Sequence, residues 1–212
     1  MNSRMRAMVG IASVFELLAN AQNRRRPGVD QPSPSRNIRA AVTPIDVPSS
    51  LAELVALSPV VIVGACQGEF PSRFFVKGDP RTDVVTDRIV RVDRVLKGTV
   101  LTNTQIAIQE LGGSLSLYDG VHSINQAIIH QRPLQQQRRY LLFLRPAGQV
   151  VNDAFDGHRF SVTGIWAGSF ELTNGGATIS DGAEAGIRQL GGLSEAELLA
   201  RVRDAIAATP NH

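Results

Sequence analysis

The stretch RIVRVDRVLKG, residues 88–98, alternates aliphatic with charged side chains, as is typical of a half-buried β-strand. Arg94 interrupts the strict alternation, so we expect a bulge near Asp93 that shifts the register and turns Val95 inward. The aliphatic residues that share one side of the strand are Val90, Val92 and Leu96. Bulged strands of this kind occur in strongly coiled barrels, and the stretch therefore predicts a β-barrel.

Further apolar segments on both sides of this strand complete a β-rich body. They are rich in β-branched and aromatic residues and are bounded by glycine, proline and asparagine. The expected strands lie within residues 60–66, 105–109, 138–146, 159–168 and 169–181. Turn signals rather than repeating helices separate them, which excludes a parallel α/β sheet. The fold class that the sequence predicts is mainly β, a small closed antiparallel barrel of five to six strands.

Two helices are expected to flank the barrel. Ser50 and Glu53 have capping-box spacing and predict a short helix over about residues 50–57. Ser194 and Glu197 have the same spacing and predict a C-terminal helix that runs to about residue 208. The residues of its apolar stripe, which we expect to pack on the barrel, are Leu198, Val202 and Ile206.

The first 48 residues predict two segments that precede the folded domain of residues 49–212. Residues 1–21 carry arginines, then an apolar stretch, then a small-x-small cleavage pattern, which indicates a signal peptide and export to the periplasm or the extracellular space. The apolar stretch is too short to span a bilayer, and Glu16 within it favours the alternative of an amphipathic helix in a cytoplasmic protein. Residues 22–48 are rich in arginine and proline and predict a flexible linker.

The distribution of charge argues against nucleic acid as a partner. The seven arginines and three acids before Pro48 give that part a net charge of +4, whereas the remainder, with 15 basic and 16 acidic residues, carries −1. A body this close to neutral lacks the electrostatic footprint of a phosphate-binding domain. The basic strand of residues 88–98 also lacks the aromatic side chains on which bases stack in OB-folds.

The chain contains a single cysteine, Cys66, which limits the disulfides and metal sites that it can form. It cannot form an intramolecular disulfide, and no cysteine-rich metal site is possible, so no cofactor is predicted. Because Cys66 lies in the apolar run VVIVGAC, we expect it to act as a small buried hydrophobic residue.

The first candidate binding region is the long connection of residues 69–83. It gathers aromatic residues between glycines and prolines, and we expect these aromatics to cover the end of the barrel or to contact a partner. The candidate binding residues there are Arg73, Phe74 and Phe75.

The second candidate region, residues 114–137, is too long for a simple turn. Its candidate binding residues are Tyr118, His122 and His130. The residue types of an acyl-transfer triad are present in Ser114, Asp119 and His122. Those of a metal site are present in Asp119, His122 and His130, but neither set has a recognised spacing. The alternative is a covering turn or short helix whose core-facing residues are Ile124, Ile128 and Ile129.

Two smaller features have structural explanations that we favour. Asp153, Asp156 and His158 lie close together, but they provide too few oxygen ligands for a calcium loop, and a solvated turn is expected. Trp166 lies between two glycines, and we expect it to fill the core or the end of the barrel.

The order SLAELVALSPVVIVGAC, RIVRVDRVLKGTV, IQELGG and RRYLLFLRP resembles that of a set of uncharacterised exported bacterial proteins. Their barrels are similar to the OB-fold of tissue inhibitors of metalloproteinases and of netrin modules. The resemblance covers about residues 50–168 and implies an OB-like barrel. It does not imply protease inhibition, because those inhibitors use a disulfide-held N-terminal cysteine, and Cys66 is neither terminal nor paired.

Together these features favour a non-enzymatic exported binding module that meets an unidentified protein or envelope component through residues 69–83 and 114–137. The alternatives are a hydrolase or metal-dependent enzyme around His122 and His130, and a nucleic-acid-binding OB-fold protein that uses the arginine-rich tail. The ligand and the oligomeric state do not follow from the sequence.

Overall fold

The computed structural model describes residues 35–40, 47–75, 83–117, 123–128, 131–147, 155, 157–165 and 167–209. The predicted signal segment and most of the predicted linker lie outside these residues. In chain order the elements are β1 (Ser35–Ala40), α1 (Leu51–Leu57), β2 (Val60–Glu69), β3 (Arg73–Phe74), β4 (Val84–Lys97), β5 (Gln105–Leu111), β6 (Gly113–Ser116), β7 (Ser123–Ile128), β8 (Arg139–Pro146), β9 (Arg159–Val162), β10 (Ser169–Thr173), β11 (Gly176–Ile179), α2 (Ala185–Arg188) and α3 (Glu195–Ala208).

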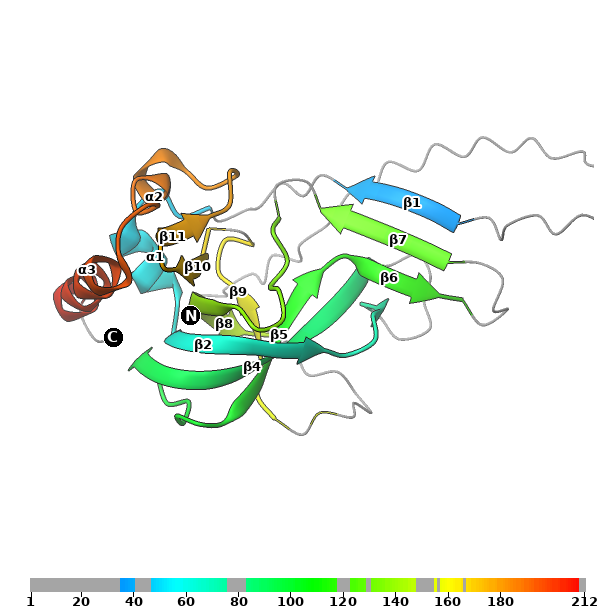
Figure 1. The fold of residues 1–212 in the computed structure, drawn as a ribbon, viewed down its shortest axis with the longest axis horizontal. Coiled ribbons are helices and arrows are strands. Elements are labelled where there is room, and N and C mark those ends of the chain that lie inside the picture. Colours follow the sequence, from blue (N-terminus) through cyan, green and yellow to red (C-terminus); the bar gives the residue numbers. More distant parts are fainter. Residues whose placement is uncertain are drawn as a thin grey trace, which may run out of the picture.

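Five strands close into a barrel in the order β2, β4, β5, β9 and β8, and β8 pairs back onto β2 (Figure 1). The closed barrel predicted from the sequence is thus confirmed. One pairing, β5 with β9, is parallel, so the barrel is mixed rather than purely antiparallel as predicted. The reason is geometric, because a ring with an odd number of strands cannot reverse direction at every step. The hairpin of β10 and β11 extends the sheet beyond β8.

The bulge predicted in the quoted strand is present in β4. Arg94 and Val92 face consecutive residues of β2, which leaves Asp93 as the extra residue. Beyond the bulge, Val95 packs against the barrel interior, as predicted. A second register shift follows, and it sends Leu96 to the outer face, where it packs below the helices. The expectation that Leu96 shares a side with Val92 was therefore wrong.

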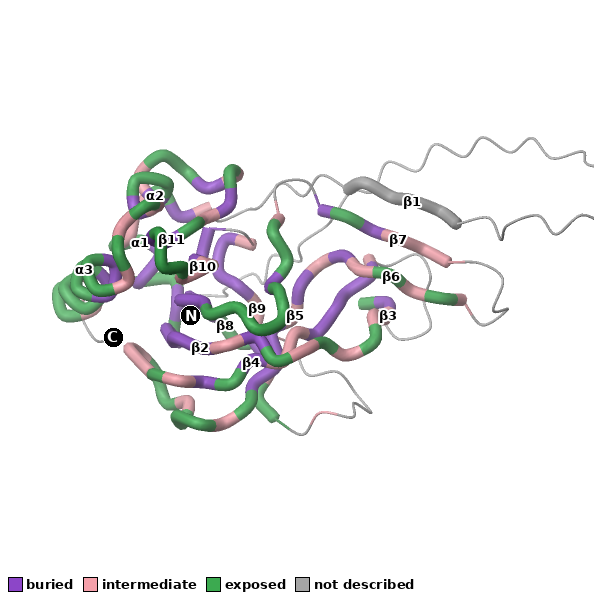
Figure 2. Tube along the Cα trace, in the orientation of Figure 1, coloured by how far each residue is buried: buried purple, intermediate pink, exposed green. Residues whose placement is uncertain are grey.

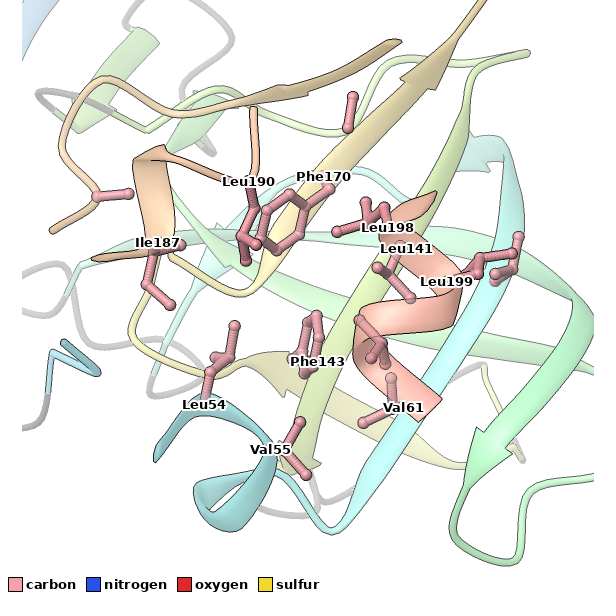
Figure 3. Close-up of a cluster of buried hydrophobic side chains, with 14 residues drawn as sticks. Leu54, Val55, Val61, Leu141, Phe143, Phe170, Ile187, Leu190, Leu198 and Leu199 are labelled. Carbon is pink, nitrogen blue, oxygen red and sulfur yellow. The ribbon is translucent and has the colours of Figure 1, made fainter. Parts of the chain in front are cut away.

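Consecutive residues of β2 and β8 are buried (Figure 2), and the side chains of these strands divide between two hydrophobic clusters. Alternate residues of β2 point to opposite sides, so Ile62 fills the barrel interior while Val61 packs outside it. The cluster outside the barrel, here called the outer cluster, lies between the sheet and the helices and contains Val61, Phe143 and Phe170. The rings of Phe143 of β8 and Phe170 of β10 lie with their centroids 5.9 Å apart (Figure 3). Two-sided burial explains why these strands read as continuous apolar runs.

Both predicted helices form, and their caps differ in one detail. Ser194 and Glu197 make the complete capping box at the start of α3. At α1, Ser50 accepts a hydrogen bond from the Glu53 amide as predicted, but the Glu53 carboxylate accepts from the amide and hydroxyl of Ser49 rather than from the amide of Ser50. The predicted stripe of α3 packs into the outer cluster.

A second, three-stranded sheet lies on the side of the barrel away from the helices, in the order β1, β7, β6 (Figure 1). Gly112 (φ +93°) and Gly113 (φ +137°) adopt backbone conformations that favour glycine, and they carry the chain from β5 into β6. The interpretation of residues 114–137 as a covering turn or short helix was wrong, because β6 and β7 form an antiparallel hairpin there. β1 lies within the predicted linker and pairs with β7 in parallel, which the sequence analysis did not anticipate.

Candidate functional site

The first predicted binding region contains a short strand that is paired to the barrel. β3 pairs with the start of β4, which buries Phe74 to 9% exposure. Phe70 packs edge-on against Phe155, with ring centroids 5.9 Å apart. Phe75 instead remains 53% exposed. Phe74 is thus buried and Phe70 packs on another aromatic ring, whereas Phe75 is exposed and can contact a partner. That these aromatics cover the end of the barrel stays a prediction. Residues 76–82 lie outside the described part of the chain.

A buried carboxylate holds the predicted residue Arg73 in place. Asp87 of β4 has a side chain only 3% exposed, and its Oδ2 accepts hydrogen bonds from Arg73 of β3 and from Arg159 of β9, both at 3.0 Å. Arg159 is itself 6% exposed. Asp87 Oδ1 and Arg73 Nη1 are shielded from water and have no hydrogen-bond partner in the structure. The cluster carries one net positive charge and joins three strands.

The four cations of the quoted strand have separate roles. Arg88 pairs with the buried Glu110 at 2.9 Å and also with Glu69, and Glu110 further accepts from the Leu134 amide at 3.0 Å. Burial raises the pKa of the Glu110 carboxyl, which Arg88 and the amide partly offset. Through the Leu134 amide, this pair is joined to a residue of the barrel interior.

The other three cations of the strand lie close to the bulge at Asp93 or beyond it. Arg91 pairs with Asp93 at 3.1 Å, Lys97 donates to the Val55 carbonyl at 2.7 Å, and Arg94 is exposed. Asp87, on the same strand, pairs with none of these cations, because its partners Arg73 and Arg159 come from β3 and β9.

Two groups that could act as nucleophiles, Cys66 and Tyr140, lie in the barrel interior near Glu110. Cys66 is buried, and burial raises the pKa of its thiol. Burial likewise raises the pKa of Tyr140 to about 12, and the Tyr140 hydroxyl accepts from the Gln135 amide at 2.8 Å. Both groups are thus held in their protonated forms, and Cys66 is the small buried hydrophobic residue that the sequence predicted.

Most of the remaining candidates are not placed by the described part of the chain. Tyr118, His122 and His130 lie outside the described residues. The same is true of Asp119, Asp153, Asp156 and Trp166. His158 is described and exposed, with its ring 6.3 Å from that of Phe160. Within the described ranges, no three histidine, cysteine or acidic side chains gather in a way that could hold a metal ion.

A cavity of about 360 Å³ lies where residues 131–135 pass the hairpin of β10 and β11. Its polar wall includes Gln131, Arg132 and Glu171, and its apolar wall includes Ile165 and Ile179. Sequence reasoning missed this cavity, because its walls come from four separate segments and no motif connects them. The proline and glutamines of residues 131–137 were the only signal that the chain there is irregular.

No known protein family matches the chain by sequence, and neither does any curated protein. Among the described helices, none combines the length and apolar character that a membrane crossing requires.

Proposed function

We propose that this protein is an exported, non-enzymatic binding module, and that its OB-like barrel presents residues 69–83 and 114–137 to a protein or another component of the cell envelope. The observation that carries this proposal is the sheet of β1, β7 and β6. It stands away from the helices, and β7 accepts an added strand from far earlier in the chain (Figure 1). Strand addition to a sheet edge is a recurrent way of binding extended segments.

The region of residues 69–83 supports the same proposal. In OB-folds, ligands bind on the face of the second and third barrel strands and on the loops beside them. The corresponding strands here are β4 and β5, and residues 69–83 connect β2 to β4. This connection carries an exposed aromatic residue, Phe75, and a cation, Arg73, that Asp87 fixes in position. Aromatic residues and arginine are the side chains enriched at the centres of interfaces.

Site-specific photo-crosslinking in the source cells tests this proposal. A photoreactive phenylalanine analogue is placed at Phe75, at Leu115 of β6, or at the exposed control positions Leu57 and Leu101. We expect a discrete crosslinked partner from Phe75 and Leu115 and none from the controls. Equal crosslinking from all four positions, or none from Phe75 and Leu115, would contradict the proposal.

Mass spectrometry of the native N-terminus tests export separately. We expect a mature start near residue 22, because the cleavage pattern ends there. An intact Met1 would contradict export and would favour the alternative that the protein is cytoplasmic.

No observation favours the two alternative functions. The imidazoles of the hydrolase hypothesis, His122 and His130, lie outside the described residues. The arginine-rich tail of the nucleic-acid hypothesis likewise lies mostly outside the described residues. In the barrel, Arg88 and Lys97 bond within the fold rather than face outward as a basic surface.

A further inference from the structure

The cavity beside β10 and β11 has two features that the fold alone does not require. The first is Gln131, whose amide oxygen is buried without a hydrogen-bond partner. Buried polar atoms are nearly always satisfied, so an orphaned one beside a cavity indicates a missing donor. Because this oxygen is shielded from water in the structure, the Gln131 side chain must rotate before the oxygen can accept a hydrogen bond from a ligand.

The second feature is backbone strain at the cavity wall. Ile165 has φ +62°, in the left-handed region that β-branched residues rarely adopt. Such strain persists only where the surroundings impose it, and it concentrates at binding and catalytic sites. Here it places a branched apolar side chain in the lining of the cavity, in the turn that leads from β9 to β10.

The charged groups of the wall define the ligand. Arg132 and Glu171 both line the cavity, and their opposite charges exclude a ligand with a large net charge. Each has a protein partner at long distance, Asp181 at 3.3 Å and Arg138 at 3.5 Å, and three of these four side chains are at least half exposed. A ligand can therefore compete for both Arg132 and Glu171 at low cost.

We propose that this cavity binds an α-amino acid with an apolar side chain. Glu171 and the Gln131 oxygen are acceptors for the ammonium group, Arg132 is the donor for the carboxylate, and Ile165 and Ile179 contact the side chain. A sugar fits the wall less well, because the described lining offers no exposed aromatic face, the ring of Tyr140 being buried. This inference goes beyond the proposed function: the cavity shares residues 131–133 and 135 with the proposed binding region 114–137, but its lining includes neither Phe75 nor β6, which the crosslinking experiment probes.

NMR titration of the full chain with L-leucine tests the proposal, with N-acetyl-L-leucine, L-leucinamide and D-glucose as comparisons. We expect saturable binding of L-leucine, with shifts confined to the cavity residues. Each derivative lacks one of the two charges and should bind at least about tenfold more weakly, as expected for the loss of one charge-assisted hydrogen bond. D-glucose should not bind.

The variants Glu171→Gln and Arg132→Gln should each weaken L-leucine binding at least about tenfold. The same exchanges at exposed positions that do not line the cavity, Glu184→Gln and Arg203→Gln, serve as matched controls and should bind as the unaltered chain does. Melting temperatures of the four variants check that each of them folds. Absence of L-leucine binding at millimolar concentrations, equal binding of N-acetyl-L-leucine, binding of D-glucose instead, or unchanged binding by both cavity variants would overturn the proposal.

Discussion

Replacing Asp87 with asparagine removes one negative charge from between two guanidinium groups and keeps the shape of the side chain. Asp87 and Arg159 are only 3% and 6% exposed and lie 3.0 Å apart, so their interaction is largely shielded from water. Removing one partner of a buried pair costs about 3–5 kcal/mol, and we expect about 3 kcal/mol because Arg73, at 24% exposure, remains partly solvated. At about 2–4 °C per kcal/mol in a domain of this size, the melting temperature should fall by about 6–12 °C.

The same exchange at Asp93 is the matched control. Asp93 lies on the same strand, but it is 25% exposed and its partners Arg91 and Arg139 are 50% and 48% exposed. Exposed pairs contribute about 0–1 kcal/mol, so Asp93→Asn should change the melting temperature by no more than a few degrees. Thermal unfolding followed by circular dichroism, with urea unfolding as a second measure, compares the two variants. The reasoning that burial makes Asp87 important for stability would be refuted by equal losses of stability in the two variants. It would also be refuted if Asp87→Asn lowered the free energy of unfolding by less than about 1 kcal/mol.

Three further predictions concern packing, reactivity and pH. Gly64→Ala should lower the free energy of unfolding by about 1–3 kcal/mol, because a Cβ there would lie 2.6 Å from a backbone oxygen of β4. Gly68→Ala, where no atom lies within 4 Å, should leave it nearly unchanged in urea unfolding. Cys66 should react with a disulfide reagent far more slowly in the folded than in the urea-unfolded chain, because it is buried and its thiol pKa is raised; equal rates would contradict this. Hydrogen bonds from Ser194 lower the Glu197 pKa below 4.5, so the stability that they add is present above pH 4.5 and is lost as the pH falls through the folded pKa. Ser194→Ala should therefore destabilise most near neutral pH and progressively less in acid, and a pH-independent difference would contradict that linkage.

The parts of the fold that the sequence predicted well are those where local chemistry determines the structure. The capping box at Ser194 needs only residues within one helical turn, and it forms as predicted. The bulge at Asp93 was predicted because Arg94 interrupts an alternation that is otherwise strict. The barrel strands were found because β2 and β8 are buried on both faces and therefore lack polar residues over several positions.

The parts that the sequence did not predict depend on pairing between distant segments. β1 and β7 are polar six-residue strands, and neither has the apolar alternation that marks a strand by itself. Gln126 of β7 is buried because it accepts a hydrogen bond from the Val84 amide and donates one to Asp83, partners more than 40 residues away. A polar residue is buried in this way only where tertiary partners satisfy it, and a single sequence does not reveal those partners. The same applies to Asp87 and to the cavity wall.

The bulge in β4 divides the strand into two halves with different surroundings. Before it, the residues pair with β5, and the charged side chains Asp87 and Arg88 are held in ion pairs with the buried partners Arg159 and Glu110. Beyond it, the strand pairs only with β2, and Arg94 is exposed. Asp93 is the residue at which one environment changes to the other. The same alternating pattern therefore covers charged side chains in different surroundings, from the buried Asp87 before the bulge to the exposed Arg94 just beyond it. Lys97, also beyond the bulge, still bonds to the Val55 carbonyl at 2.7 Å.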